Sequence, residues 1–238
     1  MKRTMSGWAC FDRVYCISLE ERPDRRAEAR AQLAAVGLLP RVEFVIANKH
    51  PVDPEQGVYE SHMRCIGKAL AAGARCFLVL EDDIVFDGFD EGRLKDAMEF
   101  LSTLPAWHML FLGCMVQGSR RTRCPSVMKI RYRSLTHACV LNRSFAETLA
   151  RIPWRNVPYD DLLRDLSDEH TYALYPAVAF QSNSPSDNDR YLPLDRFRRI
   201  FGGLRRLQKL DEFYHRRRRL IVLAHAAALC GFAAWWIS

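Results

Sequence analysis

The feature that most constrains this chain is residues 77–86, FLVLEDDIVF, in which an apolar run meets three consecutive acids. A short continuous apolar run is typical of a strand buried on both faces of a parallel sheet. Carboxylates beside a core need a partner, and the carboxyl end of such a strand is where open α/β sheets bind ligands. A divalent cation, which commonly brings a phosphate, is the natural partner of Glu81, Asp82 and Asp83.

Three interpretations of this acidic cluster compete. In the first, the acids only cap the next helix or face water. The second, a phosphate-accepting receiver domain, is excluded because eighty residues precede the cluster and the candidate later strand, residues 109–114, ends without an acid. The third is a metal-assisted nucleotide-sugar site. The residues of the cluster alone leave the first and third interpretations open.

The order of the predicted elements favours an α/β domain with a mostly parallel central sheet. Strands and helices alternate through the first half of the chain, an order that places helices on the faces of a sheet. The predicted strands are residues 14–19, 42–46, 77–80, 109–112, 128–133, 138–141 and 171–175. The predicted helices are residues 23–36, 59–72, 91–104, 144–152 and 159–167.

Residues 128–133 alternate apolar side chains with Lys129, Arg131 and Arg133. This pattern suits a strand with one wet, positive face. We interpret it as an edge strand that its charge protects from pairing with another chain.

The positive charge of the chain is concentrated near its C-terminus. The formal net charge is +7, and residues 196–219 carry ten Lys or Arg and two acids, so the remainder has a net charge of −1. A nucleic-acid-binding domain would more often carry its charge on the folded surface, so no nucleic-acid partner is expected. We therefore predict a domain over residues 1–195 and a basic linker over residues 196–219.

Residues 220–238 carry no formal charge and would extend about 28 Å as a helix, which is close to the thickness of a bilayer core. Trp235 and Trp236 lie at one end and the HRRRR run of residues 215–219 lies at the other. This layout predicts a segment that associates with an anionic membrane surface, either spanning the bilayer or lying on it. A buried C-terminal helix of the domain is the alternative.

The eight cysteines form neither a C-x-x-C pair nor a zinc spacing, which indicates reduced thiols. The N-terminus has no long apolar region of the secretory type. We expect a cytoplasmic protein at the inner face of the cell membrane.

Five segments in order resemble glycosyltransferase family 25, the sugar transferases that modify lipopolysaccharide and collagen. The resemblance runs from about Arg13 to Asp187, and its segments are residues 14–25, 57–65, 78–86, 107–113 with 136–143, and 157–187. Three positions depart from the family pattern: Ser18 replaces Asn, Val58 replaces Cys and His108 replaces Asp. The acids are retained.

The resemblance implies a GT-A-like fold, a nucleotide-sugar donor and Mn²⁺ or Mg²⁺. The chemistry agrees, because a divalent ion stabilises the charge that develops on a departing diphosphate and carboxylates are suitable ligands for it. We expect Asp83 as the first metal ligand and Glu81 as the second, or as a contact to the ribose or to the metal's waters. Asp82 would point the other way, toward structure.

Further donor-binding residues follow from the same segments. Arg22 and Arg25 would hold the diphosphate or uracil, unless they are only surface arginines. Ser61 and His62 are predicted in the first turn of a helix, where free N–H groups attract anions; a capping serine beside a solvated histidine is the alternative. Gln181, Ser186 and Asp187 would line the donor pocket.

Asp160 and Asp161 follow Pro158 at a predicted helix start. A carboxylate near the acceptor could take the proton of the attacking hydroxyl, and direct displacement would invert the anomeric centre. The family's P-x-D pattern falls on Asp160, which we choose over Asp161. Both acids also suit an ordinary helix N-terminus.

These inferences predict a transferase that moves a hexose, with galactose from UDP-galactose expected first, onto a lipopolysaccharide, oligosaccharide or glycolipid acceptor. The alternative is a noncatalytic glycan- or membrane-binding relative that retains the fold.

Overall fold

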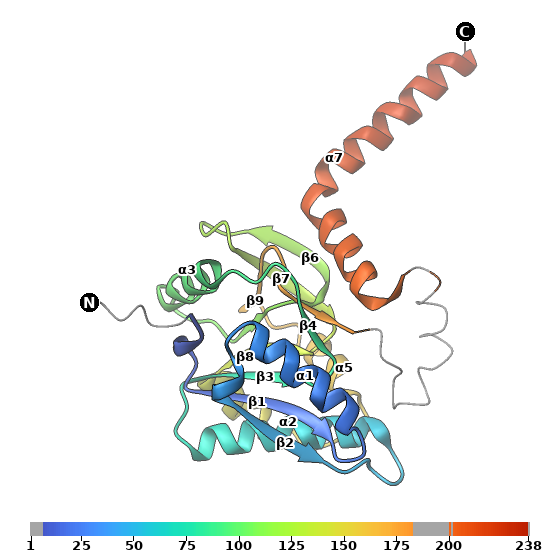
Figure 1. Ribbon diagram of the computed structural model, residues 1–238. Helices are drawn as coiled ribbons and strands as arrows, with labels where there is room; N and C mark the ends of the chain where they lie inside the picture. Colours follow the sequence, from blue (N-terminus) through green and yellow to red (C-terminus); the bar gives the residue numbers. More distant parts are fainter. Residues whose placement is uncertain (1–6, 183–199, 201, 238) are drawn as a thin grey trace.

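An eight-stranded sheet organises the computed structural model, which describes residues 7–182, 200 and 202–237 (Figure 1). Its strand order is β2-β1-β3-β8-β5-β9-β7-β6. The strands are β1 (Arg13–Leu19), β2 (Val42–Ala47), β3 (Cys76–Glu81), β5 (Met109–Phe111), β6 (Met115–Arg121), β7 (Val127–Ser134), β8 (Ala138–Asn142) and β9 (Thr171–Leu174). A separate antiparallel pair joins β4 (Ile84–Phe86) to β10 (Ala179–Gln181).

Six of the eight strands run in the same direction. Parallel pairs join β1 to β2, β1 to β3 and β5 to β9, whereas β8 and β7 run antiparallel to their neighbours. The predicted fold class, α/β with a mostly parallel central sheet and a C-terminal helix, is confirmed. Strand β6 and the short strands β4 and β10 were not predicted.

Helices cover both faces of this sheet. Along β3, Phe77 and Val79 pack into one core cluster while Leu78 and Leu80 pack into the other, as the two-residue period of a strand requires. One cluster includes residues of α1 (Pro23–Ala35) and α3 (Glu91–Ser102). The other includes residues of α2 (Pro54–Ala71), α4 (Arg143–Leu149) and α5 (Tyr159–Asp165).

Two local predictions were wrong. Helix α2 begins at Pro54 rather than near residue 59, because Asp53 caps it by accepting a hydrogen bond of 3.0 Å from the Glu55 N–H and Pro54 takes the first helical position. Strand β7, predicted as an edge strand, lies between β9 and β6. Protection of a free edge therefore does not explain its basic side chains.

Helix α7 spans Gly203–Ile237. Residues 203–219, which were predicted to be part of a basic linker, are therefore helical. Its N-terminal part packs on the domain: Gln208 is fully buried and donates to the Ala179 carbonyl at 2.8 Å. Asp211 accepts the Val116 N–H of the edge strand β6 at 3.0 Å. Arg205 and Lys209 reach Asp87, at 2.8 and 2.6 Å.

The distal half of α7 extends away from the domain (Figure 1). It carries exposed apolar side chains that include Leu220, Leu223, Leu229 and Trp236. Among the helices in the described part of the chain, none combines the length and the apolarity needed to cross a membrane.

Candidate functional site

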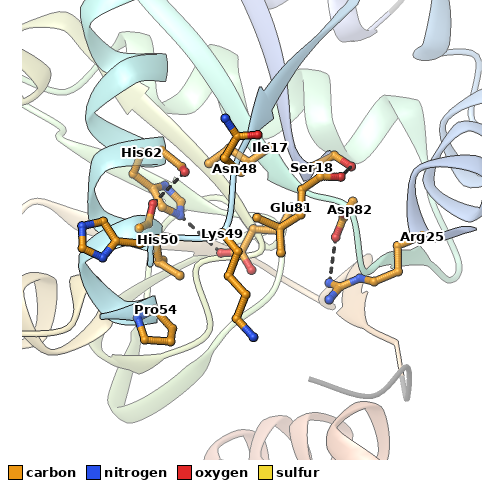
Figure 2. A pocket seen from close by; sticks show the side chains of 14 residues that line it. Ile17, Ser18, Arg25, Asn48, Lys49, His50, Pro54, His62, Glu81 and Asp82 are labelled. Atoms are coloured by element: carbon orange, nitrogen blue, oxygen red, sulfur yellow. Dashed lines mark hydrogen bonds and ion pairs between the residues drawn. The ribbon is translucent and has the colours of Figure 1, made fainter. Parts of the chain in front are cut away.

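The three acids at the end of β3 are divided between the two faces of the sheet. The alternation that buries Phe77 to Leu80 sends Glu81 toward α2 and Asp82 toward α1. Glu81 Oε1 lies 3.3 Å from His62 Nε2, and Asp82 Oδ1 lies 2.8 Å from Arg25 Nη2 (Figure 2). The sequence predicted a structural role for Asp82 rather than metal binding. The Asp82 side chain is buried in this ion pair with Arg25.

The surroundings of Glu81 bring a third element to the site. Strand β8 runs antiparallel to β3, so the residues that precede it lie at the carboxyl edge of the sheet. The Thr136 hydroxyl is 3.1 Å from Glu81 Oε1. Burial favours a higher pKa for Glu81, but the hydrogen bond and charge of His62 outweigh it and lower that pKa.

Asp83 lies in a partly buried position, with its side chain 11% exposed, and only one of its oxygens is satisfied. Its Oδ2 accepts from Gln181 Nε2 at 2.6 Å and lies 3.1 Å from Arg25 Nη2. Its Oδ1 is buried and has no hydrogen-bond partner within the described residues. Burial first, and the charge of Glu81 second, raise the pKa of Asp83 to about 7.

The unsatisfied Oδ1 of Asp83 fits a cation ligand, because a divalent ion would supply both a partner and a compensating charge. Glu81 fits less well, since its Oε1 already contacts His62 and Thr136. No group of three or more His, Cys, Asp or Glu in residues 7–182, 200 and 202–237 is placed to hold a metal. Asp83 would therefore hold Mn²⁺ or Mg²⁺ together with water and phosphate oxygens, as Mg²⁺ is commonly held in nucleotide sites.

The pKa of Asp83 predicts a pH-dependent stability. Because the pKa rises from 3.8 to about 7 on folding, the associated stability is complete below about pH 4 and is lost as the pH rises through about 7. In EDTA, wild type should therefore lose stability relative to Asp83→Asn between those values. Urea unfolding of both proteins at pH 4.5, 6 and 8 measures this difference. Mn²⁺ at pH 8 should stabilise wild type alone, and a difference that does not change with pH would contradict the prediction.

Asp160, at the start of α5, is joined to this cluster by hydrogen bonds. Its Oδ1 accepts from the Tyr132 hydroxyl at 2.7 Å and lies 2.9 Å from the Thr136 hydroxyl, which also contacts Glu81. Its Oδ2 accepts the Leu135 N–H at 2.9 Å. Burial is the main cause that raises the pKa of Asp160.

The backbone beside Asp160 is strained. Leu135 has a φ of 79°, in the left-handed region that non-glycine residues seldom adopt. Such a conformation costs on the order of 1–3 kcal/mol and persists where the surrounding structure enforces it. Asp161, by contrast, pairs with Arg164 at 2.7 Å on the helix surface and is 41% exposed. The structure therefore separates the two aspartates and joins only Asp160 to the acidic cluster.

A cavity of about 130 Å³ opens beside Glu81, between the ends of β1 and β2 and the helix α2 (Figure 2). Four predicted site residues line it: Arg25, Ser61, His62 and Glu81. The other lining residues are Ile17, Ser18, Leu19, Asn48, Lys49, His50, Pro54, Gly57, Val58 and Asp82.

Sequence reasoning missed the polar loop residues Asn48, Lys49 and His50. They follow β2, which is parallel to β1 and β3 and ends at the same edge of the sheet. The rule that pointed to Glu81, that ligands bind at the carboxyl ends of parallel strands, could have found them.

Other predicted residues have different surroundings from those expected. Ser61 and His62 lie in the third turn of α2, so their N–H groups are not at a helix N-terminus. The Ser61 hydroxyl donates to the Gly57 carbonyl at 2.7 Å. Arg22 pairs with Asp24 at 2.9 Å and is not among the residues that line the cavity. Ser186 and Asp187 lie outside the described residues.

Three comparisons relate the chain to known proteins. No family model matches it. The Homo sapiens protein named "Inactive glycosyltransferase 25 family member 3" is 28% identical over 199 residues, covering 70% of this chain and 33% of its own length. The Bos taurus protein named "Probable inactive glycosyltransferase 25 family member 3" is 27% identical over 205 residues, with the same coverage.

Among solved structures, a glycosyltransferase described as involved in the glycosylation of the major capsid of PBCV-1 is similar at a TM-score of 0.43 and 12% identity. The match covers 76% of this chain and 99% of that chain. The chain spans about a third of the length of the curated relatives it matches. Their names confirm the predicted resemblance to glycosyltransferase family 25.

Proposed function

We propose that this chain is a glycosyltransferase that moves a hexose from a nucleotide sugar to a glycan acceptor with the help of a divalent cation. The observation that carries the proposal is Asp83, a carboxylate with one buried, unsatisfied oxygen just after β3 at the carboxyl edge of the sheet, the edge at which open α/β sheets bind ligands. A bound Mn²⁺ or Mg²⁺ would stabilise the negative charge of the departing diphosphate. Arg25, which contacts Asp82 and Asp83, holds this pair of carboxylates in place.

Asp160 is the residue that we propose to accept the proton of the attacking hydroxyl. Its raised pKa makes it a stronger base than an ordinary aspartate. Tyr132 and the Leu135 N–H fix its position, and Thr136 connects it to Glu81 at the wall of the cavity. Direct displacement assisted by this base would invert the anomeric centre.

The finer identity of the substrates follows from the sequence resemblance. We propose UDP-galactose as the donor and a lipopolysaccharide-type oligosaccharide or glycolipid as the acceptor. The basic residues 216–219 and the exposed apolar side chains of distal α7 support a helix that lies on an anionic membrane surface. A cytoplasmic protein at the inner face of the membrane fits this arrangement.

A panel of nucleotide sugars, incubated with the full chain in Mn²⁺ or in EDTA, tests the proposal. We expect release of UDP from UDP-galactose in Mn²⁺, increased by a lipopolysaccharide oligosaccharide and abolished by EDTA. Release of UDP that EDTA leaves unchanged would rule out the metal. No release from any donor, with or without acceptor, would rule out the transferase.

A second candidate function, a noncatalytic glycan- or membrane-binding relative, is favoured by one structural observation and by the names of the relatives. Arg25 already provides a positive charge beside Asp83, and the curated relatives are named inactive or probably inactive. This candidate predicts binding of a UDP-sugar without turnover, or no binding. Isothermal titration with UDP-galactose alongside the release assay separates the two functions.

A further inference from the structure

The antiparallel pair of β4 and β10 connects helix α7 to Asp83. Asp83 directly precedes β4, and Asp87 directly follows it. Because β10 runs antiparallel to β4, its first residue, Ala179, lies at the Asp87 end of the pair, and its last residue, Gln181, lies at the Asp83 end. A displacement of either strand at one end of the pair is therefore transmitted to the other end.

Helix α7 holds the Asp87 end of this pair. Gln208 is fully buried, and its Nε2 donates to the Ala179 carbonyl at 2.8 Å. Arg205 and Lys209 both pair with Asp87 Oδ2, at 2.8 and 2.6 Å. The helix thus contacts β10 directly and contacts β4 through the residue that follows it.

These contacts come from one face of α7. Residues 205, 208, 209 and 212 have the i, i+3, i+4, i+7 spacing that places side chains on the same side of a helix. Glu212 accepts the Ala177 N–H at 3.3 Å, and Lys209 Nζ lies 5.3 Å from the centre of the Phe180 ring. Two turns of α7 therefore fix the position of β10 and of the residues just before it.

The other end of the pair holds Asp83. The Gln181 side chain donates to Asp83 Oδ2 at 2.6 Å, and the Ser182 N–H donates to the Asp83 carbonyl at 2.7 Å. The last residue of β10 and the residue after it thus bind both the carboxylate and the backbone of Asp83. A shift of β10 would change the direction in which this carboxylate points.

Gln208 is a costly residue if its role is only to fill space. Its Oε1 is buried and has no hydrogen-bond partner within the described residues. A buried polar atom without a partner destabilises a fold, and a leucine of similar size would avoid this cost. The hydrogen bond that Gln208 donates to β10 is a reason for an amide at this position.

We infer that Gln208 is a positioning residue for Asp83, and that α7 forms part of the candidate site through β4 and β10. The consequence for cation binding rests on the proposed function, because it requires Asp83 to be a metal ligand. The structural link from Gln208 to Asp83 does not depend on that function.

Hydrogen exchange of the full chain in EDTA tests the link without metal or substrate. In Gln208→Leu, exchange of the Ser182 N–H should accelerate at least about fivefold relative to the Val140 N–H in the central strand β8, because a hydrogen bond that holds β10 is lost. Equal acceleration at both amides would show only a loss of global stability. That result, or unchanged exchange at Ser182, would overturn the inference.

Calorimetric titration with Mn²⁺ tests the consequence for the site. Gln208→Leu should weaken Mn²⁺ binding at least about tenfold, since loss of a residue that orients a metal ligand typically has this effect. The matched control, Gln56→Leu, makes the same change in α2, where Gln56 donates to Glu60 at the helix surface. Its affinity for Mn²⁺ should be that of wild type, and equal weakening by both variants would contradict a specific role for Gln208.

A second variant decides the question if Gln208→Leu does not fold. Arg205→Gln/Lys209→Gln removes the two basic partners of Asp87 and should change both measurements in the same direction. The factor should be smaller, because these ion pairs are partly exposed. Arg205→Lys/Lys209→Arg keeps both charges and should behave like wild type. Wild-type exchange at Ser182 in the glutamine variant would count against the link.

The two measurements separate this inference from the proposed function. If wild type binds no Mn²⁺ but Gln208→Leu accelerates exchange at Ser182, the proposed metal site fails and the link from α7 to Asp83 stands. If wild type binds Mn²⁺ and Gln208→Leu changes neither measurement, the link fails and the metal site stands.

Discussion

Asp83→Asn should lower metal-dependent release of UDP from the donor at least about a hundredfold while the chain stays folded. The change removes the charge of Asp83, the carboxylate that has a buried, unsatisfied oxygen among the described residues of the site. Loss of a group that stabilises developing charge in the transition state typically costs about 10²–10³ in rate. The effect should fall on turnover at saturating donor, measured as UDP released in Mn²⁺.

The matched control for this prediction is Asp161→Asn. Asp161 is also an aspartate of the predicted site, but it is 41% exposed and pairs with Arg164 on the surface of α5. Its variant should retain the wild-type rate within about twofold. Circular dichroism and thermal unfolding of both variants establish that they are folded. Full activity of folded Asp83→Asn would contradict the metal site.

Much of this site could be predicted from the sequence because its signal is local. The unbroken apolar run before Glu81 indicated a doubly buried strand, and acids placed directly after it had to lie at the sheet edge. The two-residue period then separates Glu81 from Asp82. The proximity of Asp160 was expected only through the family resemblance, since 79 residues separate it from Glu81.

Other features had no local signal. Strand β6 carries Gly118, Ser119 and three polar or basic side chains, so neither period nor propensity marks it. Asp53 and Pro54 mark the true start of α2, five residues before the start predicted at residue 59. The docking of α7 depends on Gln208 reaching Ala179 through space. Composition alone indicated only a basic linker there.

Among the glycines that the structure describes, Gly113 should tolerate alanine least, because it marks the point where three segments meet. A Cβ at this position would lie 1.8 Å from the Ala179 carbonyl oxygen and 2.5 Å from Gln208 Nε2. Relief requires movement of the backbone of β10 and of docked α7. We expect a loss of about 3 kcal/mol in the free energy of unfolding, or roughly 6–12 °C in Tm for a chain of this size.

Gly67→Ala is the matched control, since Gly67 lies inside α2 with no atom within 4 Å of an added Cβ. It should raise stability by up to about 1 kcal/mol, because alanine favours a helix interior. Thermal unfolding compares the two variants, and hydrogen exchange of residues 203–216 reports whether α7 has loosened. Equal melting temperatures would show that the structure accommodates a Cβ at residue 113 without strain.

The substitution at Gly113 should also affect the proposed metal site. Gln181 of β10 donates to Asp83 at 2.6 Å, so displacement of β10 should weaken Mn²⁺ binding. The packing of α7 is therefore coupled to the proposed metal site.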